Sequence, residues 1–168
     1  FHSITGNTYL LGKYFFQFFK EKNIAVEMYR VEDEIELNEI NSDSNITEEI
    51  IKTTIAHKNL YEESDIMILG CPTYFGNVSY QLKRFMDLAS NYWVDSPLKG
   101  KLIVPFTTAG TPQGGGDFCL QSINRFGQHL GYNIIPVPNG IHNNKIMPAY
   151  GIIHYTGDEG KIRPDQEV

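Results

Sequence analysis

The feature that most constrains this chain is an alternation of short apolar runs with amphipathic segments. The apolar runs are rich in Ile and Val and continuous, which predicts parallel strands buried on both faces, over residues 24–31, 66–70, 102–106 and 133–137. Apolar residues at helical spacing predict helices between these runs, over residues 11–19, 45–61, 79–89 and 118–130. This rhythm indicates right-handed βαβ units around a parallel sheet.

Length and composition indicate a single globular domain spanning residues 1–168. A net charge of −6 argues against a nucleic-acid partner and suits a cytoplasmic protein, and no apolar run is long enough to span a membrane. The histidine spacings support no metal site. Phe1 and His2 read as the end of a first strand whose beginning is missing, and residues 163–168 as the opening of a helix that does not continue. We therefore expect a domain trimmed at both sequence ends.

Three segments at expected strand-to-helix turns have an unusual composition. The first, residues 3–8, carries hydroxyls at Ser3, Thr5 and Thr8 beside a helix start, which favours a neutral cradle for a phosphate. It has no Lys, so it is not a nucleotide-hydrolase loop. The alternative is a plain helix cap, because Ser, Thr, Gly and Asn are normal cap residues.

The second segment, residues 71–77, and the third, residues 107–117, suit a planar ligand. Adjacent Tyr74 and Phe75 could flank a ring system whose edge is read by backbone groups. The triple glycine at 114–116 could let the backbone lie against the same ring, although glycines alone also indicate mere flexibility. In a doubly wound sheet all such turns lie at one edge, where ligands bind.

At these residues the chain resembles the WrbA family of flavodoxin-like NAD(P)H:quinone oxidoreductases. The resemblance rests on the Ser-x-Thr-Gly-Asn-Thr loop and on residues 70–79, 98–101, 106–111, 129–131 and 148–151, and Pro72–Asn77 is its most specific part. It implies an α/β fold: a flavodoxin-like, doubly wound, five-stranded parallel sheet in the order 2-1-3-4-5, with helices on both faces.

The same resemblance implies which residues would hold FMN. The phosphate would lie on Ser3, Thr5, Gly6, Asn7 and Thr8. One side of the isoalloxazine ring would face Pro72, Thr73, Tyr74, Phe75, Gly76 and Asn77, and the other side and the ribityl chain would face Thr108, Ala109, Gly110, Thr111 and Gly115. His129 would reach the flavin site, with a helix C-terminal cap as its alternative role. Trp93 would line the quinone pocket, and the family often has Tyr at Thr5 and Arg at Tyr74.

The function expected from the resemblance is a hydride transfer from NAD(P)H to FMN and a two-electron transfer to a quinone-type acceptor. The flavin carries this chemistry, so no catalytic side chain is required. The alternatives are a flavodoxin-type electron carrier and a flavin-binding module without turnover. We also expect a homodimer or homotetramer with Trp93, in a loop at 91–94, near a neighbouring chain's flavin; alternatively Trp93 packs on its own core.

Overall fold

The computed structural model describes residues 1–34, 43–137, 141–142, 145–146 and 148–164. Its helices are α1 (Asn7–Glu21), α3 (Ser44–Lys52), α4 (Leu60–Glu63), α5 (Tyr80–Asp87), the 3-10 helix η1 (Leu88–Asn91), α6 (Tyr92–Asp95) and α7 (Gly116–His129). Its strands are β1 (Ile66–Pro72), β2 (Leu102–Ala109), β3 (Asn133–Ile134), β4 (Ile141–His142), β5 (Lys145–Ile146) and β6 (Ile152–Tyr155). No helix among these residues is long and apolar enough to cross a membrane.

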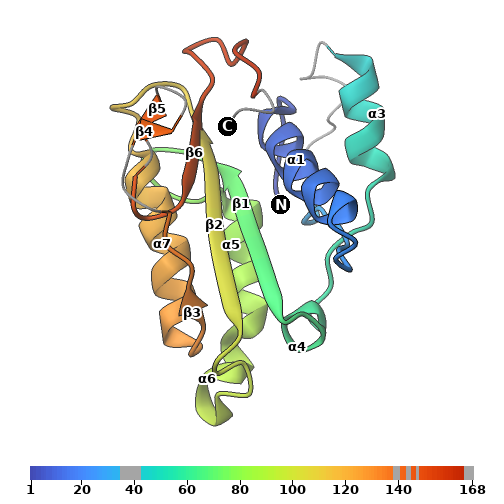
Figure 1. Cartoon of the computed structure of the whole chain (residues 1–168), viewed down its shortest axis with the longest axis vertical. Coiled ribbons are helices and arrows are strands. Elements are labelled where there is room, and N and C mark those ends of the chain that lie inside the picture. The colour runs from blue at the N-terminus through green and yellow to red at the C-terminus, as the bar shows by residue number, and fades with distance from the viewer. Residues whose placement is uncertain (35–42, 138–140, 143–144, 147, 165–168) are drawn as a thin grey trace.

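A parallel sheet of four strands forms the centre of the molecule (Figure 1). β1 pairs with β2 from Ile66 opposite Leu102 to Pro72 opposite Thr108. On the other edge of β2, β3 pairs with its beginning and β6 with its end, both in parallel. The predicted strand over 133–137 is thus only two residues long, and Pro136, which has no N–H to donate, lies just beyond it. β6 pairs along the same edge of β2, and the sequence patterns did not predict this strand.

The sheet differs from the expected five strands, and the order 2-1-3-4-5 stays a prediction. Residues 24–31 do not form the expected strand, apart from one bridge between Arg30 and Ile55. The hydrogen bonds that residues 24–31 make to described residues are too few for a β-ladder. The Val31 N–H donates to the Phe1 carbonyl at 2.8 Å, and the His2 N–H donates to the Gly70 carbonyl at 3.0 Å, so Phe1 and His2 lie between this segment and β1.

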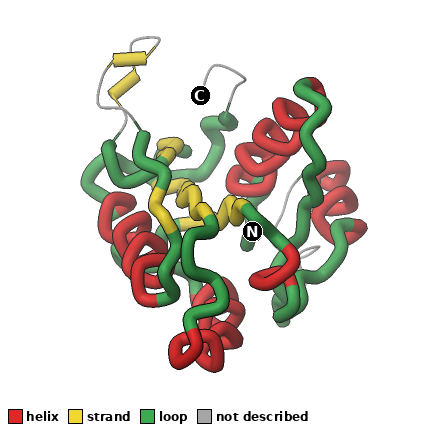
Figure 2. Tube along the Cα trace, turned by 60° about the horizontal axis from the view of Figure 1, so that its bottom comes forward, coloured by secondary structure: helices red, strands yellow, loops and turns green. Residues whose placement is uncertain are grey.

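Helices cover both faces of the sheet, as expected (Figure 2). Because side chains alternate along a strand, β1 and β2 supply two cores. One face packs Phe106 of β2 against Phe15 of α1, with ring centroids 5.4 Å apart. The opposite face packs buried apolar side chains of α5 and α7 against the strands: Leu82, Phe85, Met86 and Ile123 against Met67, Leu69 and Ile103.

Two helix predictions need correction. The helix expected over 45–61 is interrupted: α3 ends at Lys52 because Thr53 is extended, at φ −67° and ψ 133°, and α4 begins only at Leu60. The segment 91–94, expected as a loop, belongs to η1 and α6. The remaining helices begin and end within a few residues of their predicted bounds.

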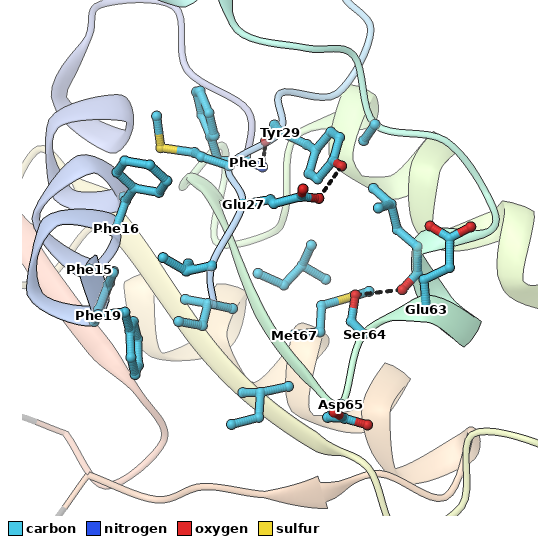
Figure 3. Close-up of a pocket in the computed structure, with 18 of the residues that line it drawn as sticks. Phe1, Phe15, Phe16, Phe19, Glu27, Tyr29, Glu63, Ser64, Asp65 and Met67 are labelled. Carbon is cyan, nitrogen blue, oxygen red and sulfur yellow. Dashed lines mark hydrogen bonds between the residues drawn. The ribbon is translucent and has the colours of Figure 1, made fainter. Parts of the chain in front are cut away.

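An apolar cavity of about 600 Å³ lies between α1, residues 24–29 and the first half of β1 (Figure 3). Its lining includes Phe15, Phe16 and Phe19 of α1. The backbone nitrogen of Phe1 borders it and donates to the Tyr29 carbonyl at 2.8 Å. None of its lining residues belongs to segments 3–8, 72–77 or 108–116, so the cavity is separate from the site described next.

Candidate functional site

Three loops meet at the edge of the sheet where β1 and β2 end: loop 1 (residues 3–8), loop 2 (residues 72–77) and loop 3 (residues 108–116). The hydroxyls of Thr8 and Thr108 lie 2.8 Å apart and join loops 1 and 3. The Thr73 N–H donates to the Thr108 carbonyl at 2.8 Å and joins loops 2 and 3. The chain therefore assembles the three segments that its sequence singled out.

Loop 1 presents open backbone donors at the start of α1. Gly6 is the N-cap, with φ 93° and no side chain to cap the helix. The Ser3 hydroxyl accepts from the Tyr9 N–H at 3.1 Å, and the Leu10 N–H bonds to the Gly6 carbonyl at 2.9 Å. The N–H groups of Asn7 and Thr8 have no acceptor among the described residues. Ser3 thus caps part of the helix, and two N–H groups stay available to an anion.

A segment that sequence reasoning missed closes over loop 1. The Asn7 side chain is buried and its Nδ2 donates to the Gly160 carbonyl at 2.8 Å and to Thr5 Oγ1 at 3.4 Å. Arg163 Nη1 donates to the Thr5 carbonyl at 2.6 Å and to Asn7 Oδ1 at 3.2 Å. No local pattern around Arg163 announces this contact, because its partners lie at the other end of the chain.

Loop 2 forms a tight turn with an aromatic side chain at its tip. The Tyr74 N–H donates to the Asn77 carbonyl at 3.0 Å, and the Asn77 N–H returns to the Tyr74 carbonyl at 2.9 Å. Phe75 and Gly76 occupy the centre of the turn with φ 51° and 72°, the left-handed pair typical of a type I′ hairpin turn. Phe75 adopts this conformation at a cost and leaves its ring fully exposed. Strain and an exposed ring together favour a functional role over packing.

Loops 2 and 3 touch through their glycines. Gly115 has φ 80° and is the N-cap of α7. A Cβ atom on Gly115 would lie 2.7 Å from the Gly76 Cα, so the two backbones meet where no side chain fits. Loop 3 continues from β2, whose last residue Ala109 accepts from the Thr156 N–H at 2.8 Å. Gly115 is therefore required by geometry and is more than a flexible spacer.

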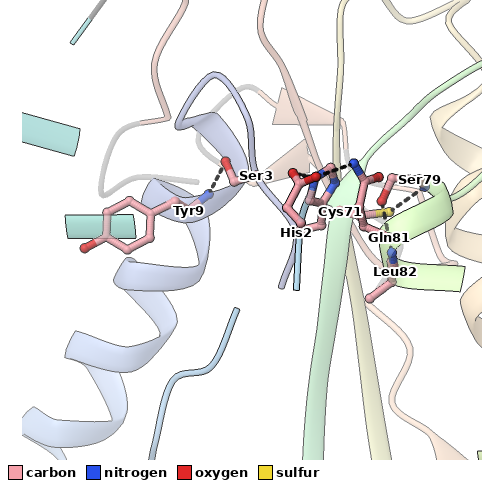
Figure 4. A network of polar contacts seen from close by, with 8 residues as sticks. His2, Ser3, Tyr9, Cys71, Ser79, Gln81 and Leu82 are labelled. Atoms are coloured by element: carbon pink, nitrogen blue, oxygen red, sulfur yellow. Dashed lines mark hydrogen bonds and ion pairs between the residues drawn. The ribbon is translucent and has the colours of Figure 1, made fainter. Parts of the chain in front are cut away.

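A buried polar network supports the base of loop 2 (Figure 4). Asp33 accepts from His2 Nε2 at 2.9 Å through Oδ2 and from Gln81 Nε2 at 3.0 Å through Oδ1. Burial lowers the pKa of His2 and outweighs the attraction of Asp33, so the ring is neutral at pH 7 and its Nε2–H donates. Burial, followed by the nearby Asp33 carboxylate, raises the pKa of Tyr74, which keeps its phenol protonated.

Two expected site residues lie far from the three loops within one chain. His129 ends α7, whose fourteen residues begin at Gly116 beside loop 3. At 1.5 Å per residue the two ends are about 20 Å apart, so His129 lies far from the three loops of its own chain and in the last turn of α7. The expectation that His129 reaches a flavin stays a prediction. Trp93 lies on α6, at the end of the sheet opposite the loops, and is 64% exposed, so it does not pack on its own core.

The remaining features fit a phosphorylated planar molecule such as FMN. Two open N–H groups at the start of α1 suit a phosphate, and the glycine contact between loops 2 and 3 permits a close backbone approach to a ring. Among the described residues there is no group of His, Cys, Asp and Glu that could hold a metal. Cys71 and Cys119 lie buried with their sulfurs 3.9 Å apart, and burial raises the pKa of Cys71.

Sequence comparison identifies the family of the chain and several relatives. A family described as NADPH-dependent FMN reductase matches residues 2–144. A protein of Archaeoglobus fulgidus named NAD(P)H dehydrogenase (quinone) is 32% identical over 126 residues, which cover 73% of this chain and 66% of the relative, just under two thirds of its length. A protein of the same name from Chromohalobacter salexigens is 31% identical over 84% of this chain and 73% of its own length.

Structure comparison agrees with the fold. A WrbA-like flavodoxin from Agrobacterium tumefaciens superposes with a TM-score of 0.52 at 20% identity, over 81% of this chain and 72% of that protein. A flavodoxin from the domain Archaea superposes with a TM-score of 0.58 at 16% identity, over 95% of this chain and 84% of that protein. At these identities the likeness shows a flavodoxin-like α/β fold and nothing further.

Proposed function

The chain belongs to the family of NADPH-dependent FMN reductases, and from this premise we propose that it is an FMN-dependent NAD(P)H:quinone oxidoreductase of the WrbA type. The observation that carries the proposal is the meeting of three loops at one sheet edge. The Thr8–Thr108 hydrogen bond joins the loop with open N–H groups to the loop with the glycines. A phosphate site and a ring site are thereby held together.

The residues of the chain bind and orient the cofactor in this proposal. The N–H groups of Asn7 and Thr8 would receive the phosphate, and Ser3 holds the start of α1 in shape through the Tyr9 N–H. Residues of loops 2 and 3 would face the two sides of the ring: Pro72, Thr73, Tyr74, Phe75, Gly76 and Asn77 on one side, and Thr108, Ala109, Gly110, Thr111 and Gly115 on the other. Bound FMN would supply the redox chemistry, taking a hydride from NAD(P)H and giving two electrons to a quinone.

The activity is tested with purified protein, FMN, NADH or NADPH, and benzoquinone, by the loss of reduced-nicotinamide absorbance. The expected result is turnover that requires both FMN and quinone. Chromatography of the flavin released on denaturation should give FMN and not FAD. Tight FMN binding without nicotinamide oxidation would instead identify an electron carrier or a flavin-binding module.

We propose that the active unit is a homodimer or homotetramer in which Trp93 approaches a neighbouring chain's flavin site. Trp93 and Val94 stand next to each other on α6 and are 64% and 75% exposed, and adjacent exposed apolar side chains often mark interfaces. Light scattering should give a mass well above 19.1 kDa. Trp93→Ala should raise KM for quinone more than KM for NAD(P)H. Phe18→Ala, which removes an exposed ring from α1, is the control and should change neither.

The proposed substrate is a small quinone-type molecule and the proposed location is the cytoplasm, where NAD(P)H is supplied. The net charge of −6 opposes contacts with nucleic-acid phosphates. Cell fractionation with an antibody against the chain tests the location, and a membrane-bound signal would contradict it.

A further inference from the structure

Loop 1 contains no cationic residue of its own, and the structure brings one to it from the other end of the chain. Arg163 donates through Nη1 to the Thr5 carbonyl at 2.6 Å and to Asn7 Oδ1 at 3.2 Å. Thr5 and Asn7 flank Gly6, the N-cap of α1. The guanidinium group therefore lies beside the open N–H groups at which the phosphate is proposed to bind.

The segment that carries Arg163 is fixed on both sides. On one side, the Ile162 N–H donates to the Thr156 carbonyl at 2.9 Å, and His154 Nε2 donates to the Ile162 carbonyl at 2.8 Å. On the other side, the Tyr14 hydroxyl donates to the carbonyl of Pro164, a buried residue, at 3.1 Å. Arg163 is half-buried between these anchors. Its side chain is thus directed to loop 1 and is not a freely moving surface cation.

The charge of Arg163 is not neutralised by any carboxylate in the described part of the chain. Other cations differ: Arg84 pairs with Glu32 and Glu34, and Lys161 pairs with Glu159. Arg163 instead bonds to a carbonyl and an amide oxygen. A helix N-terminus carries partial positive charge, so a cation beside it is unfavourable unless an anion is bound there. One bound anion would make the neighbouring positions of Arg163 and the N-terminus of α1 favourable, because it would attract both.

We propose that Arg163 supplies the positive charge that neutralises the FMN phosphate, and that it makes the site prefer FMN over riboflavin. This inference rests on the proposed function. Arg163 holds the carbonyl of Thr5 and the side chain of Asn7, so it shapes loop 1 as well as charging it. A guanidinium group has five N–H donors, so donors remain for a phosphate oxygen when Nη1 is engaged.

The test measures the dissociation constants of FMN and riboflavin by flavin fluorescence, for the wild type and three variants. Arg163→Gln removes the charge and keeps a hydrogen-bonding amide, Arg163→Lys keeps the charge, and Lys161→Gln removes a neighbouring charge that already has a partner. Arg163→Gln should weaken FMN about tenfold, since hydrogen bonds to charged groups are the strong ones, and leave riboflavin unchanged. Arg163→Lys should lose less FMN affinity than Arg163→Gln, and Lys161→Gln should bind FMN as the wild type does.

Salt provides a second readout, because raising the ionic strength should weaken FMN binding less in Arg163→Gln than in the wild type. Unchanged FMN affinity in Arg163→Gln, or an equal loss for FMN and riboflavin, would overturn the inference while leaving the proposed function intact. Failure of the wild type to bind either flavin would overturn both. The thermal midpoint of each variant shows whether a loss of binding comes from unfolding. If Arg163→Gln is unfolded, the comparison of FMN with riboflavin is made in Arg163→Lys, which should lose some FMN affinity and no riboflavin affinity.

Discussion

The hydroxyl oxygens of Thr8 and Thr108 lie 2.8 Å apart, although 100 positions separate the two residues in the chain. Both side chains are buried, so neither hydroxyl has water to replace a lost partner. Thr8 lies in the first turn of α1 and Thr108 is the last residue but one of β2, which means that a single hydrogen bond joins the proposed phosphate site to the proposed ring site. The two halves of the site should therefore respond to substitution as one unit.

The first prediction concerns the stability of this pair. Thr8→Ala and Thr108→Ala should each lower the free energy of unfolding by about 1–3 kcal/mol, because each leaves the other hydroxyl buried without its partner. The double variant should cost less than the sum of the two single variants. Urea unfolding of the four proteins measures this, with Thr5→Ala, an exposed threonine of the same loop, as control. Strict additivity would contradict the coupling.

The second prediction separates binding of the FMN phosphate from binding of the flavin ring. The Thr8 hydroxyl can accept from Thr108 and donate its own proton to the phosphate, so Thr8→Ala should weaken FMN binding by about 1–3 kcal/mol and leave riboflavin binding unchanged. Thr108→Ala removes the same Thr8–Thr108 hydrogen bond from the side of the proposed ring site and should weaken the binding of FMN and riboflavin alike. Fluorescence titrations provide the comparison. Equal losses of both flavins in Thr8→Ala would show that Thr8 acts through the fold of loop 1.

The third prediction concerns the contact between loops 2 and 3. Gly115→Ala should weaken FMN and riboflavin together, because its Cβ would lie 2.7 Å from the Gly76 Cα and would push the loops apart. Gly100→Ala is the matched control: Gly100 has φ 89°, comparable to φ 80° at Gly115, and nothing lies within 4 Å of its Cβ position. The control should lose about 1–2 kcal/mol of stability from backbone strain and keep both affinities. Equal effects of the two variants would refute the contact argument.

The fourth prediction uses two glycines that face the same ring. Gly12 lies within α1, and a Cβ there would meet the Phe106 ring at an ordinary 3.6 Å. Gly12→Ala should stabilise the protein by about 0.5–1 kcal/mol through helix propensity. Gly70→Ala would place a Cβ 2.4 Å from the same ring and should destabilise the protein clearly. Thermal unfolding of both variants tests the pair, and a destabilised Gly12→Ala would contradict it.

Local patterns were sufficient to predict three of the helices and the three loops, but not the break between α3 and α4 or the helical conformation of 91–94. Helical spacing placed α1, α5 and α7, and continuous apolar runs placed β1 and β2, because these signals depend on neighbours in sequence. Loops 1, 2 and 3 could be grouped because parallel strands bring their ends to one edge. The composition of each loop then indicated a phosphate or a ring.

Contacts between distant residues could not be predicted in this way. The return of the chain to β2 as β6, and the approach of Arg163 to Thr5, depend on how residues 148–164 fold back. The distance of His129 from loop 3 of its own chain likewise depends on the length of α7, which the resemblance does not give. The sequence therefore predicts a phosphate site at loop 1 but not the contact of Arg163 with that loop.

The last prediction concerns pH and the network of His2, Asp33 and Gln81. Burial lowers the pKa of His2 below its ordinary value of about 6.5, so at acidic pH the unfolded chain binds a proton that the folded chain resists. Stability should therefore be complete above about pH 6.5 and should fall as the pH drops below it. Other groups also titrate in this range, so a variant at His2 is needed to isolate its contribution.

His2→Gln retains a donor for Asp33 and does not titrate, so its stability should depend less on pH than that of the wild type. The thermal midpoint between about pH 5 and pH 8 measures this difference. His57→Gln is the control, because His57 is exposed and lies outside the network. It should retain the full pH dependence of the wild type. If His2→Gln and the wild type lose stability in parallel on acidification, the loss comes from other groups, and His2 does not resist protonation in the fold.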